Sequence, residues 1–148
     1  MIYLVRLFPL KEELAAYPYI SVCIPARNEE RDIKNCVKSV LNQDYPNFEV
    51  IVVDDNSSDN TAKIVCSMTE EYPNLIFISG AQLAPGWMGK PYALHQAYQK
   101  SRGQYLLFTD ADLMYRSHAL KTAMHTMICK DLDLLTLMTA AIFGSFWE

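Results

Sequence analysis

The sequence predicts an α/β domain built on a doubly wound, mostly parallel sheet with helices on its faces. Short apolar runs alternate with amphipathic helical segments along the chain, an order that favours parallel strands joined by right-handed crossovers. Three of the apolar runs end directly in polar or acidic residues. The length of 148 residues suits one domain with a core of its own.

Composition narrows the classes of function. Hydrophobic residues make up 51% and charged residues 20%, which is typical of a globular chain. The net charge of -4, without any basic run, argues against a nucleic-acid partner. Three of the four cysteines lie in apolar patterns, so reduced, buried thiols of a cytoplasmic domain are expected. No run reaches the ~18–20 apolar residues of a membrane span, and association with the cytoplasmic face of a membrane stays open for a longer protein.

The first half of the chain predicts two strands and two helices after an N-terminal arm, residues 1–18. A strand over 19–24 ends at Pro25, and Asn28 is expected to cap a helix that runs to Asp44-Tyr45-Pro46. A second strand, 48–53, leads into Asp54 and Asp55, and a polar turn precedes a helix around residues 62–68.

The second half continues the alternation. A strand over 75–78 precedes a loop, 80–89, that is long enough to suggest a function. The next helix opens at Lys90-Pro91, with Pro91 at its first position and Gly103 as its C-terminal cap. The run 105–108 reads as a strand buried on both faces. Ser117 is expected to cap a helix over 120–130, and 132–138 to form a fifth strand.

Polar clusters follow three of these strands, at Pro25–Glu29, Asp54–Asp55 and Asp110–Asp112. Parallel strands place their carboxyl ends at one edge of the sheet, where ligands bind. Asp110 and Asp112 point to the same side of an extended chain, and carboxylates roughly 6–7 Å apart suit a hard divalent cation that also binds substrate phosphates. Asp-x-Asp alone favours a polar turn; the shared edge shifts the balance to the functional interpretation.

A dinucleotide-binding domain is the first alternative for such a sheet. It needs a glycine-rich first turn, so that a pyrophosphate can approach a helix N-terminus. This chain has Pro25-Ala26-Arg27-Asn28-Glu29-Glu30 there, and the two glutamates would repel a pyrophosphate. Phosphates must be held in another way, and a metal on Asp110 and Asp112 supplies one.

Four segments in this order resemble the family 2 glycosyltransferases of the GT-A fold. They are Ser21–Glu30 (SVCIPARNEE), Val52–Thr61 (VVDDNSSDNT), Pro85–Lys90 (PGWMGK) and Phe108–Asp112 (FTDAD). The resemblance covers roughly residues 19–138, and Trp87–Lys90 is similar to the branch that glycosylates hopanoid or carotenoid lipids. It implies a GT-A (Rossmann-like) mostly parallel sheet flanked by helices, with residues 19–138 as a partial nucleotide-sugar-binding domain.

The resemblance implies roles at the nucleotide. Pro25, Arg27 and Glu29 would surround the base and ribose. Asp55 would hydrogen-bond the uracil edge, and Asp54 would support that turn. Each acid also has a plainer interpretation, as a cap or as a partner of a helix dipole.

The resemblance also implies roles at the diphosphate. Lys90 would lie near the base or the diphosphate, although a solvated residue in a first helical turn is the plainer interpretation. Asp110 would contact the ribose or a metal-bound water, and with Asp112 it would form the metal site. Asp112 would ligate Mn²⁺ or Mg²⁺, the divalent metal cofactor implied by the family.

The resemblance implies transfer of a sugar from a nucleoside-diphosphate donor, with a UDP-sugar favoured, to an acceptor that includes lipids among its candidates. Family members are longer and carry the acceptor site and catalytic base in their second half. No residue here matches that base, so the base is expected beyond Glu148, the last residue of the sequence. We therefore expect a chain truncated after the nucleotide-binding half, with the apolar residues 139–148 leading into a missing acceptor half.

Two alternatives to this function stay open. One is a catalytically incomplete fragment that binds nucleotide sugar. The other is a nucleotidyltransferase, which shares the use of a metal and carboxylates but normally has a glycine-rich basic loop that is missing here.

Overall fold

The computed structural model of the chain describes residues 16–137. Most of the expected N-terminal arm and all of the apolar tail, 139–148, lie outside the described residues. Strands and helices alternate between these limits, as β1 (Ile20–Ala26), α1 (Ile33–Leu41), β2 (Phe48–Asp54), α2 (Thr61–Met68), β3 (Leu75–Ser79), α3 (Gly89–Lys100), β4 (Tyr105–Phe108) and α4 (Ala119–Cys129). The alternation predicted by the apolar runs is confirmed.

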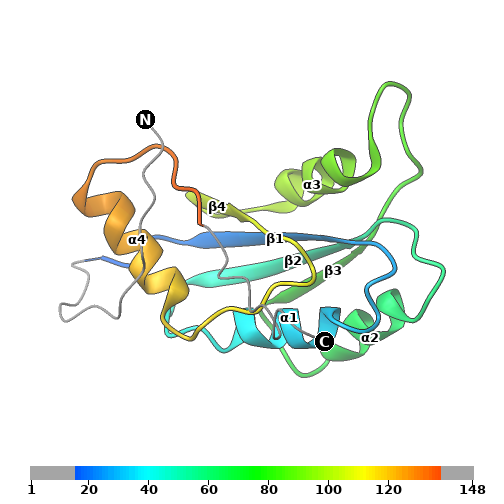
Figure 1. Cartoon of the computed structure of the whole chain (residues 1–148), viewed down its shortest axis with the longest axis horizontal. Helices are drawn as coiled ribbons and strands as arrows, with labels where there is room; N and C mark the ends of the chain where they lie inside the picture. Colours follow the sequence, from blue (N-terminus) through cyan, green and yellow to red (C-terminus); the bar gives the residue numbers. More distant parts are fainter. Residues whose placement is uncertain (1–15, 138–148) are drawn as a thin grey trace, which may run out of the picture.

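The described strands form one parallel sheet in the order β3-β2-β1-β4. Ile20 at the start of β1 is in register with Phe48 of β2 and with Tyr105 of β4. The strand order reverses between β1 and β4, because the chain passes from β3 through α3 to the opposite edge of the sheet (Figure 1). Such a reversal opens a crevice at the carboxyl ends of the strands.

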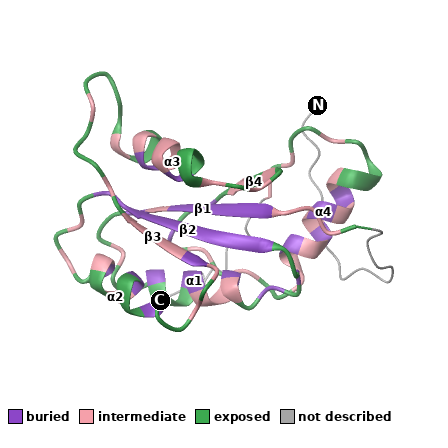
Figure 2. Ribbon diagram, turned by 180° about the vertical axis from the view of Figure 1, so that it is seen from behind, coloured by how far each residue is buried: buried purple, intermediate pink, exposed green. Residues whose placement is uncertain are grey.

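Helices cover both faces of the sheet, with α1 and α2 on one side and α3 on the other (Figures 1 and 2). Side chains alternate between the two faces along each strand. Val22, Ile24, Val50 and Val52 belong to the larger core, which also contains the apolar face of α1. The smaller core joins Cys23, Ile51 and Val53 to two small residues of α3, Ala93 and Ala97. Because β1 and β2 are covered on both faces, they are the most deeply buried elements.

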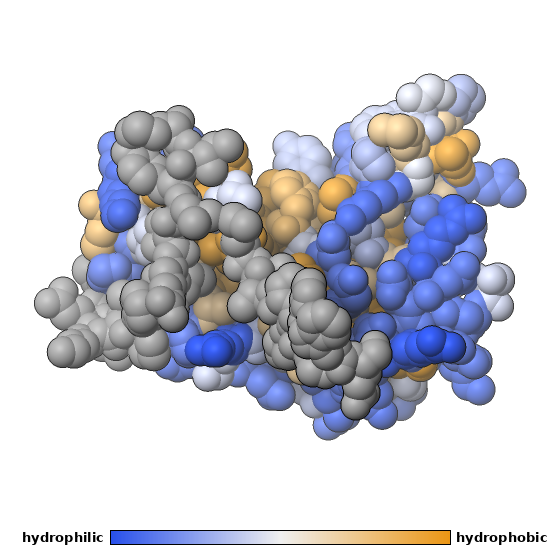
Figure 3. All heavy atoms as spheres, in the orientation of Figure 1, coloured by the Kyte–Doolittle hydropathy of each residue, from blue (hydrophilic) through white to orange (hydrophobic). Residues whose placement is uncertain are grey.

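β4 corrects one prediction, since it is not buried on both faces. Leu106 and Phe108 are 37% and 50% exposed. β4 is an edge strand of the sheet that the described residues form, and hydrophobic atoms are visible over this part of the molecule in Figure 3. An apolar run shows that a strand forms, but not how many layers cover it.

Two predicted helix starts are wrong. α1 begins at Ile33, after a turn over residues 30–32, because Asn28 has a left-handed backbone with φ 56° and cannot start a helix. α3 begins at Gly89, so Pro91 is its third residue. Ser117 does not cap α4; instead the Gln43 side chain accepts a hydrogen bond from the backbone N–H of Leu120 at 3.0 Å.

Two other local predictions also fail. Gly103 is no helix cap, because α3 ends at Lys100; a Cβ there would lie 2.4 Å from the Ser21 backbone nitrogen and 2.6 Å from the Tyr105 carbonyl oxygen. Close backbone approach therefore explains this glycine. Residues 132–137 form no strand, although their apolar pattern predicts one, and Met138 lies outside the described residues.

The thiols are only partly as expected. Cys23 and Cys36 are buried, whereas Cys66 and Cys129 are exposed, and all are free. Burial raises the pKa of the Cys23 thiol to about 11 and that of Cys36 to about 12. Within residues 16–137, no helix has the length and apolarity needed for a membrane span.

An ion pair between a buried carboxylate and an exposed arginine ties the amino ends of three strands together. The Glu49 carboxylate, fully buried on β2, accepts hydrogen bonds from Ser21 Oγ at 2.7 Å and from the Arg102 guanidinium at 2.6 and 2.9 Å. The backbone N–H of Arg102 donates to the same carboxylate at 2.9 Å. Burial alone would raise the pKa of Glu49, but these hydrogen bonds outweigh it and hold the pKa below 4.5.

Candidate functional site

A pocket of about 260 Å³ lies where β1, β2 and β4 end. It is lined by Pro25, Ala26, Arg27, Glu29, Asp55, Lys90, Asp110, Ala111 and Asp112. Of the binding and metal residues predicted from the sequence, every one except Asp54 lines this pocket. Parallel strands bring the segments after β1, β2 and β4 to one edge, and the first turn of α3 adds Lys90.

None of these pocket residues is the expected catalytic base, because the family resemblance places the base beyond Glu148. Glu148 itself lies outside the described residues 16–137. The position of the base therefore stays a prediction, and the pocket is a candidate binding site.

Asp54 and Asp55 separate because neighbouring residues at a strand end point in opposite directions. Asp54 is the last residue of β2, and its Oδ2 accepts a hydrogen bond from the Ser57 backbone N–H at 3.3 Å. Its Oδ1 is buried, with no hydrogen-bond partner among the described residues. Asp55 lines the pocket, as predicted; Asp54 supports the turn behind it.

Asp55 is approached by a cation and by a helix N-terminus. The Arg27 guanidinium approaches its Oδ2 at 3.5 Å. A Cβ on Gly89 would come within 2.7 Å of the same oxygen. Glycine at the first position of α3 therefore lets the helix approach the carboxylate closely, where the helix dipole favours negative charge.

Lys90 and Asp110 form the second ion pair in the pocket. The Lys90 Nζ lies 2.5 Å from Asp110 Oδ1, and both side chains are more than half exposed. Asp112, also exposed, has no ion-pair partner among the residues the structure describes.

The pKa of Glu29 is affected by the excess of acids at this edge of the sheet. Its pKa is raised, first by partial burial and then by the negative charges of Asp112, Asp32, Asp59 and Asp110. Unlike the sequence-based alternative, Glu29 does not serve a helix dipole, since α1 starts four residues later. Its backbone is instead fixed, because its N–H donates to Thr61 Oγ1 at 2.8 Å.

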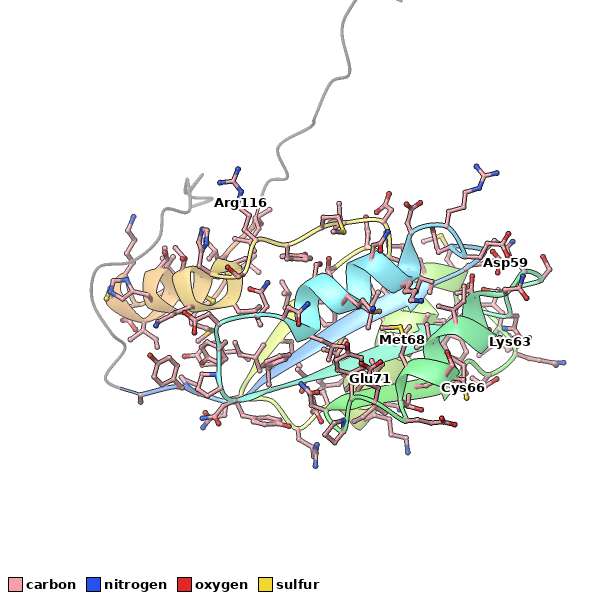
Figure 4. All side chains as sticks on the ribbon, turned by 90° about the horizontal axis from the view of Figure 1, so that it is seen from below. Asp59, Lys63, Cys66, Met68, Glu71 and Arg116 are labelled. Carbon is pink, nitrogen blue, oxygen red and sulfur yellow. The ribbon has the colours of Figure 1, made fainter. Side chains whose placement is uncertain are left out.

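The loop after β1 is held against the loop after β2 by reciprocal hydrogen bonds. Asn28 donates its N–H to Ser57 Oγ at 2.9 Å, and its Oδ1 accepts the N–H of Ser58 at 2.8 Å. The N–H of Glu30 donates to Asp59 Oδ2 at 3.1 Å. Asp59, labelled in Figure 4, also accepts the N–H of Thr61, the first residue of α2, at 2.9 Å, so it joins the two loops at the start of this helix.

The loop after β4 is held from behind by α1. The Cys36 thiol donates to the Asp110 carbonyl oxygen at 3.4 Å, and Ser39 Oγ accepts the N–H of Tyr115 at 3.0 Å. Gln43 Nε2 donates to the Arg116 carbonyl oxygen at 2.8 Å. Figure 4 shows this connection running alongside α1 to Arg116, near the start of α4. These contacts position the Asp110–Asp112 segment without touching the pocket.

Sequence reasoning missed the two small pocket residues, Ala26 and Ala111, and the supporting residues behind them. Ala111 is only 3% exposed and packs into the larger core, so the carboxylates on either side of it are anchored. The spacing of Cys36 and Ser39 on α1 and of Gln43 just after it is a signal that could have been found, because residues three and four apart lie on one side of a helix.

A family model described as glycosyl transferase family 2 matches residues 21–147. The chain belongs to this family. The β-monoglucosyldiacylglycerol synthase of Trichormus variabilis is 35% identical over 112 residues, which cover 74% of this chain and 24% of that protein. The 4,4'-diaponeurosporenoate glycosyltransferase of Staphylococcus haemolyticus is 36% identical over 115 residues, covering 77% of this chain and 30% of that protein. Both names are lipid-related, in line with the resemblance of the Trp87–Lys90 segment.

Solved glycosyltransferase structures share the fold of this family 2 domain. The structure of S. aureus TarS 1-349 in complex with UDP-GlcNAc has a TM-score of 0.63 and 34% identity, covering 74% of this chain and 31% of that one. The mannosyltransferase PcManGT from Pyrobaculum calidifontis, in complex with GDP-Man and Mn²⁺, has a TM-score of 0.67 and 28% identity, covering 76% and 33%. The GT-A fold is confirmed. The chain spans about a quarter to a third of these relatives.

The carboxylates of this glycosyltransferase domain fit a metal ion that is shared with a substrate. Within residues 16–137, no group of three or more His, Cys, Asp or Glu side chains is placed to hold an ion alone. The pocket has four carboxylates and two cations. Mg²⁺-like ions use one or two carboxylates together with substrate phosphates, which matches Asp110 and Asp112 beside an open pocket.

Proposed function

We propose that this domain binds a nucleoside-diphosphate sugar, with UDP as the favoured nucleotide, for metal-dependent transfer of the sugar to an acceptor. The observation that carries the proposal is the shared pocket at the carboxyl edge, which brings Asp110 and Asp112 together with Arg27, Asp55 and Lys90. The complexes of TarS with UDP-GlcNAc and of PcManGT with GDP-Man and Mn²⁺ support it.

Arg27, Asp55 and Pro25 are proposed to receive the base and ribose. Asp55 is 8% exposed and fixed by Arg27 and the start of α3, so its carboxylate offers a preorganised acceptor for the N–H of a uracil ring. Pro25 has no N–H and a restricted backbone, which keeps this wall of the pocket rigid. Glu29, with its raised pKa, borders the same space.

Asp110 and Asp112 are proposed to hold Mn²⁺ or Mg²⁺ beside the diphosphate. A bound ion offsets the negative charge that builds on the departing nucleoside diphosphate. Lys90 adds a second positive group at the same place, and Cys36 and Ser39 keep the loop of the two acids in position. The two carboxylates would thus hold the ion, and with Lys90 they would place positive charge beside the diphosphate in an arrangement that solvent alone would not organise as well.

The choice of acceptor is a proposal about the whole protein, because this chain spans only part of the length of its relatives. A lipid acceptor is proposed from the names of the two curated relatives, and with it a place at a membrane surface. The catalytic base is proposed to lie in sequence that follows Glu148 in the whole protein. Family membership favours glycosyl transfer over the nucleotidyl transfer considered above. Donor binding is the step that we assign to residues 16–137.

Chemical-shift mapping with UDP and Mg²⁺ tests the proposed site. We expect the amide signals of Ala26, Asp55 and Ala111 to move on addition of both ligands. The amides of Arg102 and Gly103, at the opposite edge of the sheet, serve as an internal control and should stay in place. The absence of any shift, or shifts confined to that opposite edge, would contradict the proposal.

A further inference from the structure

The pocket contains more negative than positive groups, and each of its cations already holds an acid. Arg27 lies beside Asp55, and Lys90 lies beside Asp110. Glu29 and Asp112 have no cation within ion-pair distance among the described residues. A nucleoside diphosphate that enters this pocket therefore meets two cations that are each paired with an acid. It also meets two acids that have no cation beside them.

The two ion pairs differ in how firmly they are built. Asp55 is nearly buried beside the start of α3, so the Arg27 side chain, although itself 63% exposed, approaches a carboxylate with little room to move. The Lys90–Asp110 pair is exposed on both sides, with 59% and 53% of the side-chain surfaces accessible. Exposed pairs contribute little to folding stability. Lys90 is therefore held at Asp110 by a contact that can be exchanged at low cost.

We propose that Lys90 is an exchangeable counter-ion: it neutralises Asp110 in the donor-free pocket, and moves to the diphosphate when Asp110 takes a divalent cation. This inference rests on the proposed function and adds the order in which Lys90 contacts Asp110 and then the diphosphate. Lys90 is then an antagonist of the metal when no nucleotide is present, and a partner of the metal once the diphosphate has bound.

Two properties of Lys90 support this exchange. Its ammonium is a compact charge on a flexible stem with rotatable donors, so one side chain can serve two acceptors in turn. Its Cα is fixed in the first turn of α3, next to Gly89 and the pocket wall at Asp55. The side chain can therefore turn from one pocket oxygen to another while the helix stays in place. A fixed structural ion pair would instead favour burial of both partners.

The exchange predicts effects of opposite sign in one variant. Lys90→Met keeps the apolar stem and removes the charge. Because the competitor of the metal at Asp110 is lost, we expect the affinity for Mn²⁺ alone to rise about two- to fivefold. Because the ligand of the diphosphate is lost as well, the affinity for UDP at saturating Mn²⁺ should fall about tenfold.

Calorimetric titration of Mn²⁺ alone, and of UDP at saturating Mn²⁺, measures both effects. Lys63→Met is the matched control, since it changes the net charge equally on α2. Lys63 is exposed and projects from α2 away from the sheet in Figure 4. We expect this control to bind both ligands with affinities within about twofold of the wild type, since Lys63 does not line the pocket.

Equal or weaker binding of Mn²⁺ to Lys90→Met than to Lys63→Met would overturn the exchange. A wild-type chain that binds Mn²⁺ but not UDP would contradict the proposed function, and the comparison of Mn²⁺ affinities would still decide the role of Lys90. A purely structural role predicts weaker binding of both ligands, so it is separated from the exchange by the sign of the Mn²⁺ effect. Absence of Mn²⁺ binding to both chains, with UDP present as well as without it, would overturn both proposals.

Discussion

Glu49 and Asp55 show how position on a strand decides what a carboxylate does. Glu49 lies on β2 in the face covered by α3, fully buried, and Arg102 and Ser21 satisfy it. Asp55 lies just past the carboxyl end of the same strand and lines the pocket. One acid holds the sheet together and the other is available to a ligand, because the strand ends between them.

Glu49→Gln should destabilise the fold in a pH-dependent way. The pKa of Glu49 is lower in the folded chain than its ordinary value of 4.5, so its stabilising contribution is complete above that value and is lost as the pH falls through the folded pKa. We expect the variant to lose about 1–3 kcal/mol of unfolding free energy at neutral pH. The difference from the wild type should shrink as the pH falls through the folded pKa of Glu49, which lies below 4.5.

Urea unfolding at about pH 7 and at about pH 3 measures this difference. Glu71→Gln, at an exposed position after α2, is the matched control (labelled in Figure 4). A difference that grows as the pH falls would contradict the assigned role of Glu49.

α1 has two functions that its apolar periodicity does not reveal. One face fills the larger core through Ile33, Val37 and Val40. Polar groups on and just after the helix bind the chain between Asp110 and Leu120, which links the pocket to the start of α4. The helix therefore acts as a support between the sheet and the loop of the two acids.

Gln43→Met should loosen the start of α4. The side chain is nearly buried and makes three hydrogen bonds, to Ser39, Arg116 and Leu120, none of which Met can replace. We expect a loss of about 1–3 kcal/mol in stability and faster hydrogen exchange of the first-turn amides of α4. Gln99→Met, on the exposed end of α3, is the control. Unchanged exchange at Leu120 would show that Gln43 does not cap this helix.

The sequence predicts the elements better than their ends. Alternating apolar runs are enough to identify each strand and helix up to α4, because burial of one helix face or of a strand leaves a period in the chain. The start of α1 is missed because Asn28 suits both a helix cap and a left-handed turn, and only contacts with Ser57 and Ser58 decide between them. The exposure of β4 is missed because it depends on which layers cover the sheet.

For the candidate site too, the sequence predicts which residues come together but not how they pair. Strand ends of a parallel sheet lie at one edge whatever the details of packing, so the gathering of Pro25, Asp55 and Asp112 follows from the chain order. The pairing of Lys90 with Asp110 could not be foreseen, because it depends on where α3 crosses the sheet. Asp54, which the family resemblance implies to support the turn beside Asp55, accepts the Ser57 N–H there and does not line the pocket.

For the molecule as a whole, burial divides the cysteines into two classes. Cys66 and Cys129 are exposed, whereas Cys23 and Cys36 are buried, with pKa values raised to about 11 and about 12 by burial. We expect iodoacetamide at about pH 8 to modify the first two in the native protein and all four in urea, since thiolates are the reactive form. Mass spectrometry of digested samples provides the measurement. Rapid native labelling of Cys36 would contradict its place behind the Asp110 loop.

The central claim is that Asp112 makes nucleotide binding depend on a metal ion. Titration of UDP into the protein with Mn²⁺, with a chelator, and into Asp112→Asn tests it most directly, with the exposed Asp133→Asn as the control. We predict that UDP binds with Mn²⁺ and that the chelator or Asp112→Asn weakens this binding about tenfold or more, while Asp133→Asn leaves it unchanged. Equal UDP affinity in all four titrations, or none in any, would contradict the claim.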